Sequence, residues 1–321
     1  GRLAQAVLAR GRAVPARPAA QPQQRAGGMP SSPPGKQVVV VTGCSSGLGR
    51  ALCYALARRP DIAVVATARK IAAVSDLQEQ GVAALALALD VTSDASLKEA
   101  MERAAKLGGG AIDAVICNAG GATFGPLALQ PLDEIRSVME TNVLGVISTV
   151  QAAVPFMAKP QGRGGRILIV GSVSATVTTP FAGAYCASKA AVHACGEALR
   201  MELKPLGISV TNIHTGAFKS SFSTNAESGS SLGRYAEGWY APILGAITKR
   251  MWASQNRPDS QTAEQVAEAI VGKCLVRGPS PAAICVAGGT FKMLLLGFLQ
   301  KWFPAWLIDS KMLQAFRLAK L

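Results

Sequence analysis

Tyr185 and Lys189 are four residues apart in the segment YCASK, within a predicted helix of about residues 182–205. Because an α-helix makes one turn about every 3.6 residues, the two side chains share one face. An ammonium group beside a phenol lowers the pKa of the phenol, so Tyr185 could pass a proton near neutral pH. A half-buried tyrosine beside a solvent-exposed lysine has the same spacing, and the pair alone leaves both interpretations open.

The rest of the chain predicts the elements that would position this pair. Residues 37–42, QVVVVT, form a β-branched run typical of a strand buried on both faces. Further strands are predicted at residues 62–67, 83–89, 113–117, 165–170, 207–213 and 282–287. Helices are predicted between them, near residues 49–59, 71–80, 93–107, 132–158, 182–205 and 262–276. This alternation indicates right-handed β-α-β units. The predicted fold class is therefore α/β, a single Rossmann-like doubly wound parallel sheet of about seven strands with helices on both faces.

A glycine-rich segment, TGCSSGLG, joins the first predicted strand to the following helix. Gly43, Gly47 and Gly49 would let the turn close, let backbone N–H groups approach a pyrophosphate, and let the helix pack on the strand. The same loop supplies three further candidate cofactor contacts, at Ser45, Ser46 and Leu48.

The end of the second predicted strand indicates which dinucleotide the loop would bind. A carboxylate commonly holds a free ribose 2′-hydroxyl at this place, but the chain has Thr67 and Ala68 followed by Arg69 and Lys70. A guanidinium group clamps a 2′-phosphate, which a carboxylate would repel. Arg69 therefore favours NADP(H) as the cofactor, and an ordinary solvated arginine is the alternative.

Six motifs occur along the chain in the same order as in a known protein family. They are TGCSSGLG, LDV with Asp90, CNAG at 117–120, TNVLG at 141–145, GSVSA at 171–175 and YCASK. Over about residues 36–286 the chain resembles the short-chain dehydrogenase/reductase family. The sequences of these motifs are most similar to those of the branch that contains hydroxysteroid and retinol dehydrogenases and 1-acyldihydroxyacetone-phosphate reductases. Members of that branch act on apolar ketones or aldehydes.

The resemblance implies a catalytic role for four residues. Tyr185 would be the acid in carbonyl reduction, and Ser172 would hydrogen-bond the substrate carbonyl. Lys189 would lower the pKa of Tyr185 and bind the nicotinamide ribose. Asn142 would kink its helix and hold a water that links Lys189 to bulk solvent.

The resemblance also implies further cofactor contacts. Asp90 and Val91 would bracket the adenine, and Asn118, Ala119 and Gly120 would steady the sheet beside the cofactor. Gly216 would approach the nicotinamide, with Ser220 binding its carboxamide. One departure lies here: Thr215 stands where many members have proline, which leaves this loop less restricted.

The segment of about residues 216–260 corresponds to the substrate lid of that family. It contains several aromatic residues, namely Phe218, Phe222, Tyr235, Trp239, Tyr240 and Trp252. Its basic residues include Lys219, Arg234, Lys249 and Arg250. Aromatic groups beside cations would suit a lipid chain with a phosphate head, although any lid has aromatics to pack and exposed basic residues.

The expected function is NADPH-dependent reduction of a lipid-like carbonyl, with 1-acyldihydroxyacetone phosphate as the leading substrate. A hydroxysteroid or retinol dehydrogenase is the alternative within the enzyme class. A cofactor-binding structural subunit of a larger assembly is the alternative outside it.

Both ends of the chain extend beyond the predicted domain of residues 36–290. Residues 1–35 contain five arginines and no acidic residue, which is the composition of a chloroplast or mitochondrial transit peptide, of a disordered tail, or of untranslated sequence before Met29. Residues 291–321 form an amphipathic tail whose run MLLLGFL is too short to span a bilayer. Trp302 and Trp306 with flanking cations are typical of a segment at a membrane interface, while packing on its own domain, a second subunit or a partner is the alternative.

Composition limits the other classes of function. The net charge of +14 invites a nucleic-acid interpretation, but aromatic residues are 5% of the chain and no nucleic-acid motif is present. The seven cysteines and two histidines show no metal-binding spacing, so no metal site is expected. We expect a hydrophobic small-molecule substrate and a homo-oligomer, a dimer or tetramer, with membership of a larger complex left open. Without a transit peptide, the expected location is the cytosolic face of the endoplasmic reticulum or a lipid droplet.

Overall fold

The computed structural model describes residues 35–158, 165–224, 232–275, 278–288, 290–302 and 304–318. The basic arm predicted at residues 1–35 therefore lies outside the described residues, except for Gly35.

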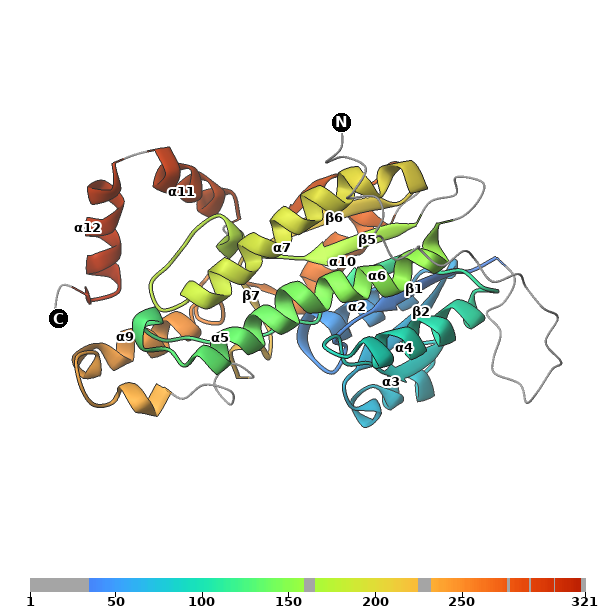
Figure 1. Cartoon of the computed structure of the whole chain (residues 1–321), viewed down its shortest axis with the longest axis horizontal. Helices are drawn as coiled ribbons and strands as arrows, with labels where there is room; N and C mark the ends of the chain where they lie inside the picture. Colours follow the sequence, from blue (N-terminus) through green and yellow to red (C-terminus); the bar gives the residue numbers. More distant parts are fainter. Residues whose placement is uncertain are drawn as a thin grey trace, which may run out of the picture. The chain divides into compact units, whose positions relative to one another are not determined.

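Seven parallel strands form one sheet in the order β3-β2-β1-β4-β5-β6-β9 (Figure 1). The strands are β1 (Gln37–Val41), β2 (Ile62–Ala68), β3 (Leu85–Ala88), β4 (Ala114–Cys117), β5 (Arg166–Val170), β6 (Ser209–Thr215) and β9 (Ala283–Val286). The order reverses between β1 and β4, and ligands of doubly wound sheets bind outside the carboxyl ends of the strands at such a point. The predicted fold class is confirmed.

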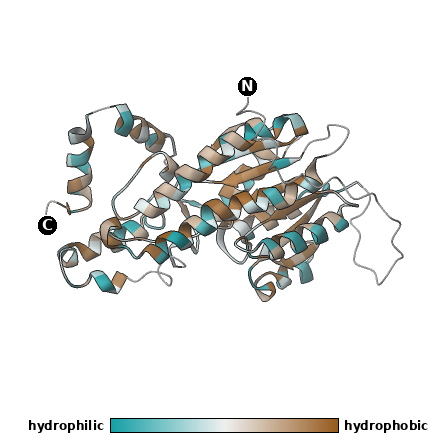
Figure 2. Ribbon diagram, in the orientation of Figure 1, coloured by the Kyte–Doolittle hydropathy of each residue, from teal (hydrophilic) through white to brown (hydrophobic). Residues whose placement is uncertain are grey.

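Helices cover both faces of the sheet because its central strands are apolar on both sides (Figures 1 and 2). Along β1, Val39 and Val41 belong to one core cluster, while Val38 and Val40 belong to the other. The first cluster also contains side chains of α2 (Gly47–Ala57) and α10 (Ala263–Cys274). The second contains side chains of α4 (Asp94–Leu107), α6 (Gly145–Met157) and α7 (Gly183–Glu202).

Two predicted helices are interrupted in the structure. Residues 71–80 form a 3₁₀ turn and the short helix α3 (Ser75–Glu79), because Val74 leaves the helical conformation and buries its side chain completely. Residues 132–158 form α5 (Leu132–Met139) and α6, with a π-helical segment at Glu140–Leu144 between them.

Two short strands bracket the predicted lid. β7 (Phe218–Lys219) pairs with β8 (Gln261–Thr262), and the described residues between them include two 3₁₀ turns and the helix α9 (Leu244–Met251). Residues 225–231 of the predicted lid lie outside the described residues.

The C-terminal tail forms two helices, α11 (Thr290–Trp302) and α12 (Ala305–Ala315). Gln300 exchanges two hydrogen bonds with the backbone of Thr178, and a Cβ added to Gly297 would lie 2.8 Å from the carbonyl oxygen of Thr176. The tail thus packs in part on its own domain, beside the loop that follows β5. Among the described residues, no helix has the length and apolarity that crossing a bilayer requires.

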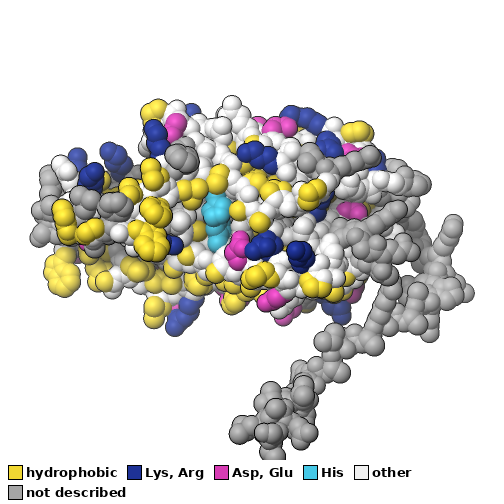
Figure 3. Space-filling model, turned by 90° about the horizontal axis from the view of Figure 1, so that it is seen from above, with side chains coloured by type: hydrophobic (Ala, Val, Ile, Leu, Met, Phe, Trp, Pro, Cys, Tyr) yellow, Lys and Arg dark blue, Asp and Glu magenta, His cyan; other side chains and the backbone are white. Residues whose placement is uncertain are grey.

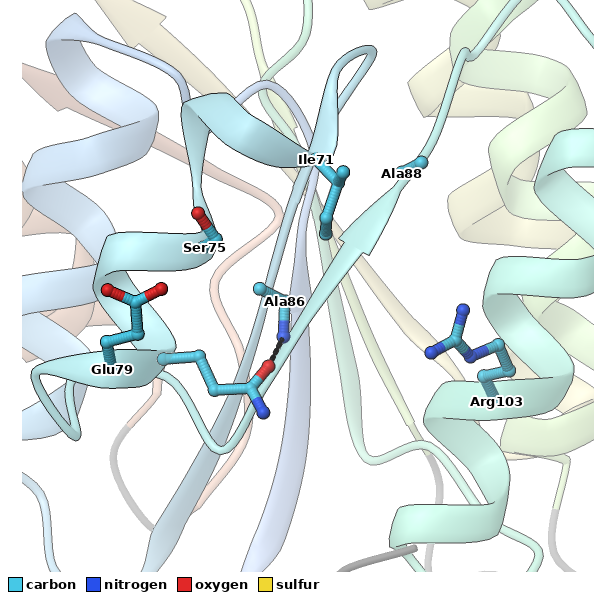
Figure 4. Close-up of a pocket in the computed structure, with 7 residues that line it drawn as sticks. Ile71, Ser75, Glu79, Ala86, Ala88 and Arg103 are labelled. Atoms are coloured by element: carbon cyan, nitrogen blue, oxygen red, sulfur yellow. Dashed lines mark hydrogen bonds between the residues drawn. The ribbon is translucent and has the colours of Figure 1, made fainter.

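The groove in Figure 4 lies at the opposite edge of the sheet from β9. It has a volume of about 590 Å³ and is lined by α3, the edge strand β3 and α4, including Arg103. The side-chain oxygen of Gln78 accepts a hydrogen bond of 2.7 Å from the N–H of Ala86, so it satisfies a donor of the edge strand. This groove contains none of the predicted site residues.

Candidate active site

The glycine-rich loop passes close to the chain that follows β4. Gly43 has a φ of +72°, and a Cβ added to it would lie 2.9 Å from the Cα of Ala119. A Cβ on Gly49 would meet the carbonyl oxygen of Gly43 and would lie 2.5 Å from the amide nitrogen of Asn118. Gly49 therefore lets α2 pack against the end of β1, as the sequence predicts.

Hydrogen bonds fasten the ends of β1 and β4 together. The side chain of Asn118 donates to the carbonyl oxygens of Thr42 at 2.9 Å and Gly43 at 3.1 Å. The hydroxyl of Thr42 accepts from the backbone N–H groups of Asn118 and Ala119, each at 3.0 Å. Sequence reasoning missed Thr42, although its place at the carboxyl end of a buried strand is a signal for such a role.

The first turn of α2 faces the loop with its backbone donors. Ser46 is the N-cap residue in an extended conformation, its side chain makes no capping hydrogen bond, and the first turn holds no acidic residue. Ser45 is exposed, whereas Leu48 is buried in the core. The loop thus has the narrow cradle and free N–H groups that suit a pyrophosphate.

Arg69 and Asp90 lie at the carboxyl ends of the neighbouring strands β2 and β3. Arg69 is exposed. Hydrogen bonds from the backbone N–H and the hydroxyl of Thr92 lower the pKa of Asp90, with a smaller contribution from the charge of Arg69. Val91 is buried against Gly145 of α6, where an added Cβ would lie 2.7 Å from its side chain.

Asn142 lies in the π-helical segment, at the place where the resemblance predicts a kink. Its side-chain nitrogen donates to the carbonyl oxygen of Gly121 and to the hydroxyl of Ser188, each at 2.9 Å. Its side-chain oxygen accepts from the N–H of Gly121 at 2.8 Å. Beside it, a Cβ on Gly120 would lie 3.1 Å from that oxygen and 3.7 Å from Nζ of Lys189. Asn142 therefore joins the loop after β4 to α7.

Ser172, Tyr185 and Lys189 meet where β5 ends and α7 begins. Ser172 is buried, and its side chain makes a hydrogen bond with that of Tyr185. Lys189 is also buried, and its Nζ lies 5.9 Å from the centre of the Tyr185 ring. The one-turn spacing of the sequence does bring the phenol and the ammonium group to the same place.

The predicted acidity of the phenol is wrong. Burial raises the pKa of Tyr185 to about 12, while the hydrogen bond from Ser172 and the charge of Arg250 lower it by less. Burial also lowers the pKa of Lys189 to about 8. The loss of hydration outweighs the nearby polar groups, and Lys189 is not among the groups that shift the pKa of Tyr185.

The loop after β6 shows why glycine stands at position 216. An added Cβ would meet the carbonyl oxygen of Gly288 and would lie 2.6 Å from the hydroxyl of Thr290, so packing against the start of α11 excludes a side chain. Ser220 lies beside the glycine-rich loop, because a Cβ added to Gly47 would lie 3.4 Å from its Cβ. The structure therefore brings Ser220 to the cradle that Gly43 and Gly49 form.

Two lid residues, Phe222 and Arg250, lie near Tyr185, although the sequence analysis did not place them in the catalytic site. The ring of Phe222 lies 5.5 Å from that of Tyr185, measured between centres. Arg250 of α9 interacts electrostatically with Tyr185 and Cys186. Both belong to the aromatic and basic composition of the lid, but composition does not say which members point inward.

Comparisons with known proteins agree with this geometry. Residues 37–230 match the family model described as short chain dehydrogenase. The chain is 37% identical over 199 residues to human 17-beta-hydroxysteroid dehydrogenase type 1, in an alignment that covers 58% of each chain. It is 34% identical over 182 residues to an NADPH-dependent 1-acyldihydroxyacetone phosphate reductase of Schizosaccharomyces pombe, covering 56% of this chain and 60% of that one.

The fold of this chain is also similar to that of solved structures. A short-chain dehydrogenase from Streptomyces avermitilis superposes with a TM-score of 0.67 and 24% identity, covering 89% of this chain and 97% of that one. The matched family model covers more than half of the chain, in the region that contains the cradle, Ser172, Tyr185 and Lys189. The chain belongs to the short-chain dehydrogenase/reductase family of NAD(P)-dependent oxidoreductases.

Proposed function

We propose that this protein is an NADPH-dependent reductase of a lipid-like ketone, with 1-acyldihydroxyacetone phosphate as the leading substrate. The observation that carries the proposal is the meeting of Ser172, Tyr185 and Lys189 at the carboxyl ends of the strands, beside the cradle formed by Gly43 and Gly49.

The residues at the cradle fit a dinucleotide. Side chains at positions 43 and 49 would fill the space beside the loop, and the first turn of α2 offers N–H groups to a pyrophosphate. When bound, the reduced nicotinamide supplies the hydride. Arg69 would hold the 2′-phosphate, and its exposure leaves the guanidinium group accessible for a bidentate contact.

Tyr185 would donate the proton that completes the reduction. With a pKa of about 12, the phenol is protonated at neutral pH and is available as the acid. As its proton moves to the carbonyl oxygen, negative charge develops on the phenol oxygen. The hydrogen bond from Ser172 and the charge of Arg250 both stabilise that charge, because both lower the pKa of Tyr185.

Lys189 would bind the nicotinamide ribose and supply the next proton to Tyr185. Its pKa of about 8 lies near neutral pH, where a group exchanges protons in both directions most readily. The hydrogen bonds of Asn142 hold α7 against the loop that follows β4, so that Lys189 stays aligned with Tyr185.

The lid would bind the acyl chain. Phe124, Ala182, Cys186 and Met251 form an apolar cluster beside Tyr185, against which Trp252 packs. The fission yeast relative is named for reduction of an acyl ketone with a phosphate group, which supports this choice of substrate. The human relative, named as a hydroxysteroid dehydrogenase, favours a steroid as the second candidate.

A substrate panel tests the proposal. NADPH oxidation would be measured with 1-acyldihydroxyacetone phosphate, a keto-steroid and retinal, and NADPH binding would be measured separately by fluorescence. We expect the highest kcat/KM for the acyl ketone. A higher kcat/KM for the steroid would make the steroid the preferred substrate. Binding of NADPH without reduction of any carbonyl would overturn the reductase assignment.

We also propose that α11 and α12 contact the surface of an anionic membrane. The exposed fractions of Trp302 and Trp306 are 74% and 70%, and Phe298 is 53% exposed. Lys301 and Lys311 lie on the same two helices and are exposed. Figure 3 shows apolar and basic side chains intermixed at the end of the domain that carries these helices. Exposed tryptophans beside cations suit the interface of an anionic bilayer.

A further inference from the structure

Four basic residues of the lid have different surroundings in the structure. Lys219 and Lys249 are exposed. Arg234 is exposed in part and lies 3.6 Å from a carboxylate oxygen of Glu134. Arg250 is half-buried, and loss of hydration lowers its pKa. The position of Arg250 therefore needs a separate explanation.

Arg250 points from α9 towards the elements that carry the catalytic residues. Its Nε donates a hydrogen bond of 2.8 Å to the hydroxyl of Thr179, in the loop before α7. Its guanidinium carbon lies 5.6 Å from the centre of the Phe124 ring, in the loop after β4. Its charge acts on Tyr185 and Cys186 of α7. The guanidinium group thus lies between the two loops that flank the substrate side of Tyr185.

No described residue supplies a counter-charge to Arg250. Within the described part of the chain, no carboxylate lies within ion-pair distance of Arg250, and the hydrogen bond to Thr179 uses only Nε. A half-buried cation without a counter-charge loses part of its hydration, and the ring of Phe124 offsets only part of that cost. The two terminal nitrogens of an arginine form the fork that matches two oxygens of a phosphate.

We propose that Arg250 binds the phosphate monoester of an anionic lipid ketone whose carbonyl lies at Tyr185. This inference rests on the proposed reductase function and names the group that selects its substrate. Lys249, the exposed neighbour of Arg250 on α9, would not take part.

The substitution Arg250→Met tests the proposal, with Lys249→Met as the matched control on the same helix. The substrates would be 1-acyldihydroxyacetone phosphate and the same acyl ketone without phosphate, and NADPH binding would report the folded state. For Arg250→Met we expect kcat/KM to fall about 100-fold more for the phosphorylated ketone than for the unphosphorylated one, whose smaller loss reports the effect of the Arg250 charge on Tyr185. Arg250→Lys should retain part of the activity with the phosphorylated ketone, and Lys249→Met should retain all of it.

Equal losses with both ketones, while NADPH still binds, would overturn the proposal, because Arg250 would then act only on the fold or on Tyr185. Retained discrimination between the ketones in Arg250→Met would overturn it as well.

A binding experiment separates this inference from the proposed function. Decyl phosphate and decanol would be titrated calorimetrically into the NADPH-bound protein, below their aggregation concentrations. Tighter binding of decyl phosphate that Arg250→Met removes would support the anion site even if acyl ketones were not reduced. Equal binding of the two ligands by the wild-type protein would overturn the anion site, even if the protein proved to be a ketone reductase.

Discussion

The Nζ of Lys189 donates a hydrogen bond of 3.0 Å to the carbonyl oxygen of Val170, the last residue of β5. This contact draws the ammonium group into the interior beside the end of the sheet. Burial there is the one cause of its lowered pKa, which is about 8.

The pH dependence of the enzyme should follow Lys189. Because the pKa in the folded state lies below the ordinary value of 10.5, the lysine is charged below about pH 8 and neutral above it. We expect kcat/KM for NADPH, which reports the free enzyme, to fall about tenfold for each pH unit above that value. The free energy of unfolding should instead rise with pH between about 8 and 10.5, because in that range the unfolded chain binds the lysine proton and the folded chain does not. A kcat/KM that stays constant to pH 10 would contradict this assignment.

Removing the phenol should separate chemistry from cofactor binding. Tyr185→Phe should lower kcat by about 10³-fold, because the proton donor is lost, and NADPH should still bind. Ser172→Ala should lower kcat by about 10²-fold, because the hydrogen bond that lowers the pKa of Tyr185 is lost. Steady-state kinetics and fluorescence titration with NADPH check both variants. Wild-type turnover by either one would exclude that residue from the mechanism.

The exposed guanidinium group of Arg69 should decide between the two dinucleotides. Arg69→Asp should weaken NADPH binding by about 10- to 100-fold and improve the use of NADH, because the new carboxylate repels a 2′-phosphate. Lys70→Asp changes the same charge at the next exposed position and serves as the control. Unchanged kinetics of Arg69→Asp with NADPH would refute the proposed contact, and an equal effect of both variants would indicate general electrostatics.

Two glycine substitutions should have opposite effects on stability. A methyl group at Gly49 would meet the backbone of Gly43, so Gly49→Ala should destabilise the fold by about 3 kcal/mol and impair NADPH binding. Gly272 lies exposed in α10, with no atom within 4 Å of an added Cβ, so Gly272→Ala should stabilise it by about 0.5–1 kcal/mol. Urea unfolding measures both changes, and a neutral Gly49→Ala would show that the loop can shift.

Membrane contact should depend on the exposed tryptophans of the tail. The double variant of Trp302→Ala and Trp306→Ala should lose most of its flotation with liposomes that contain phosphatidylglycerol. Trp239→Ala serves as the control, because Trp239 is 81% exposed but lies in the lid. Point variants are preferable to deletion of residues 291–321, since deletion would also expose the loop that Gln300 covers. Equal flotation of the wild-type protein, the double variant and the Trp239→Ala control would contradict the membrane proposal.

Local patterns in the sequence predicted most of the fold. The β-branched run of β1 and the strand ends near Cys117 and Val170 were recognisable because a strand buried on both faces needs a continuous apolar run. The pairing of Tyr185 with Lys189 follows from helical geometry alone. The glycines of the first loop were predicted from spacing, and the structure adds their reason, which is the proximity of the chain after β4.

Nonlocal packing decided what those patterns could not. The break at Val74 depends on the core that receives its side chain, and Gly216 is fixed by residues some seventy positions away, at Gly288 and Thr290. The sequence alone determined which groups could do chemistry, because residue type and helical spacing are local. Only the tertiary structure decided that burial makes Tyr185 a weaker acid, and that Arg250 rather than Lys249 faces it, because hydration and long-range charge depend on every element that surrounds a group.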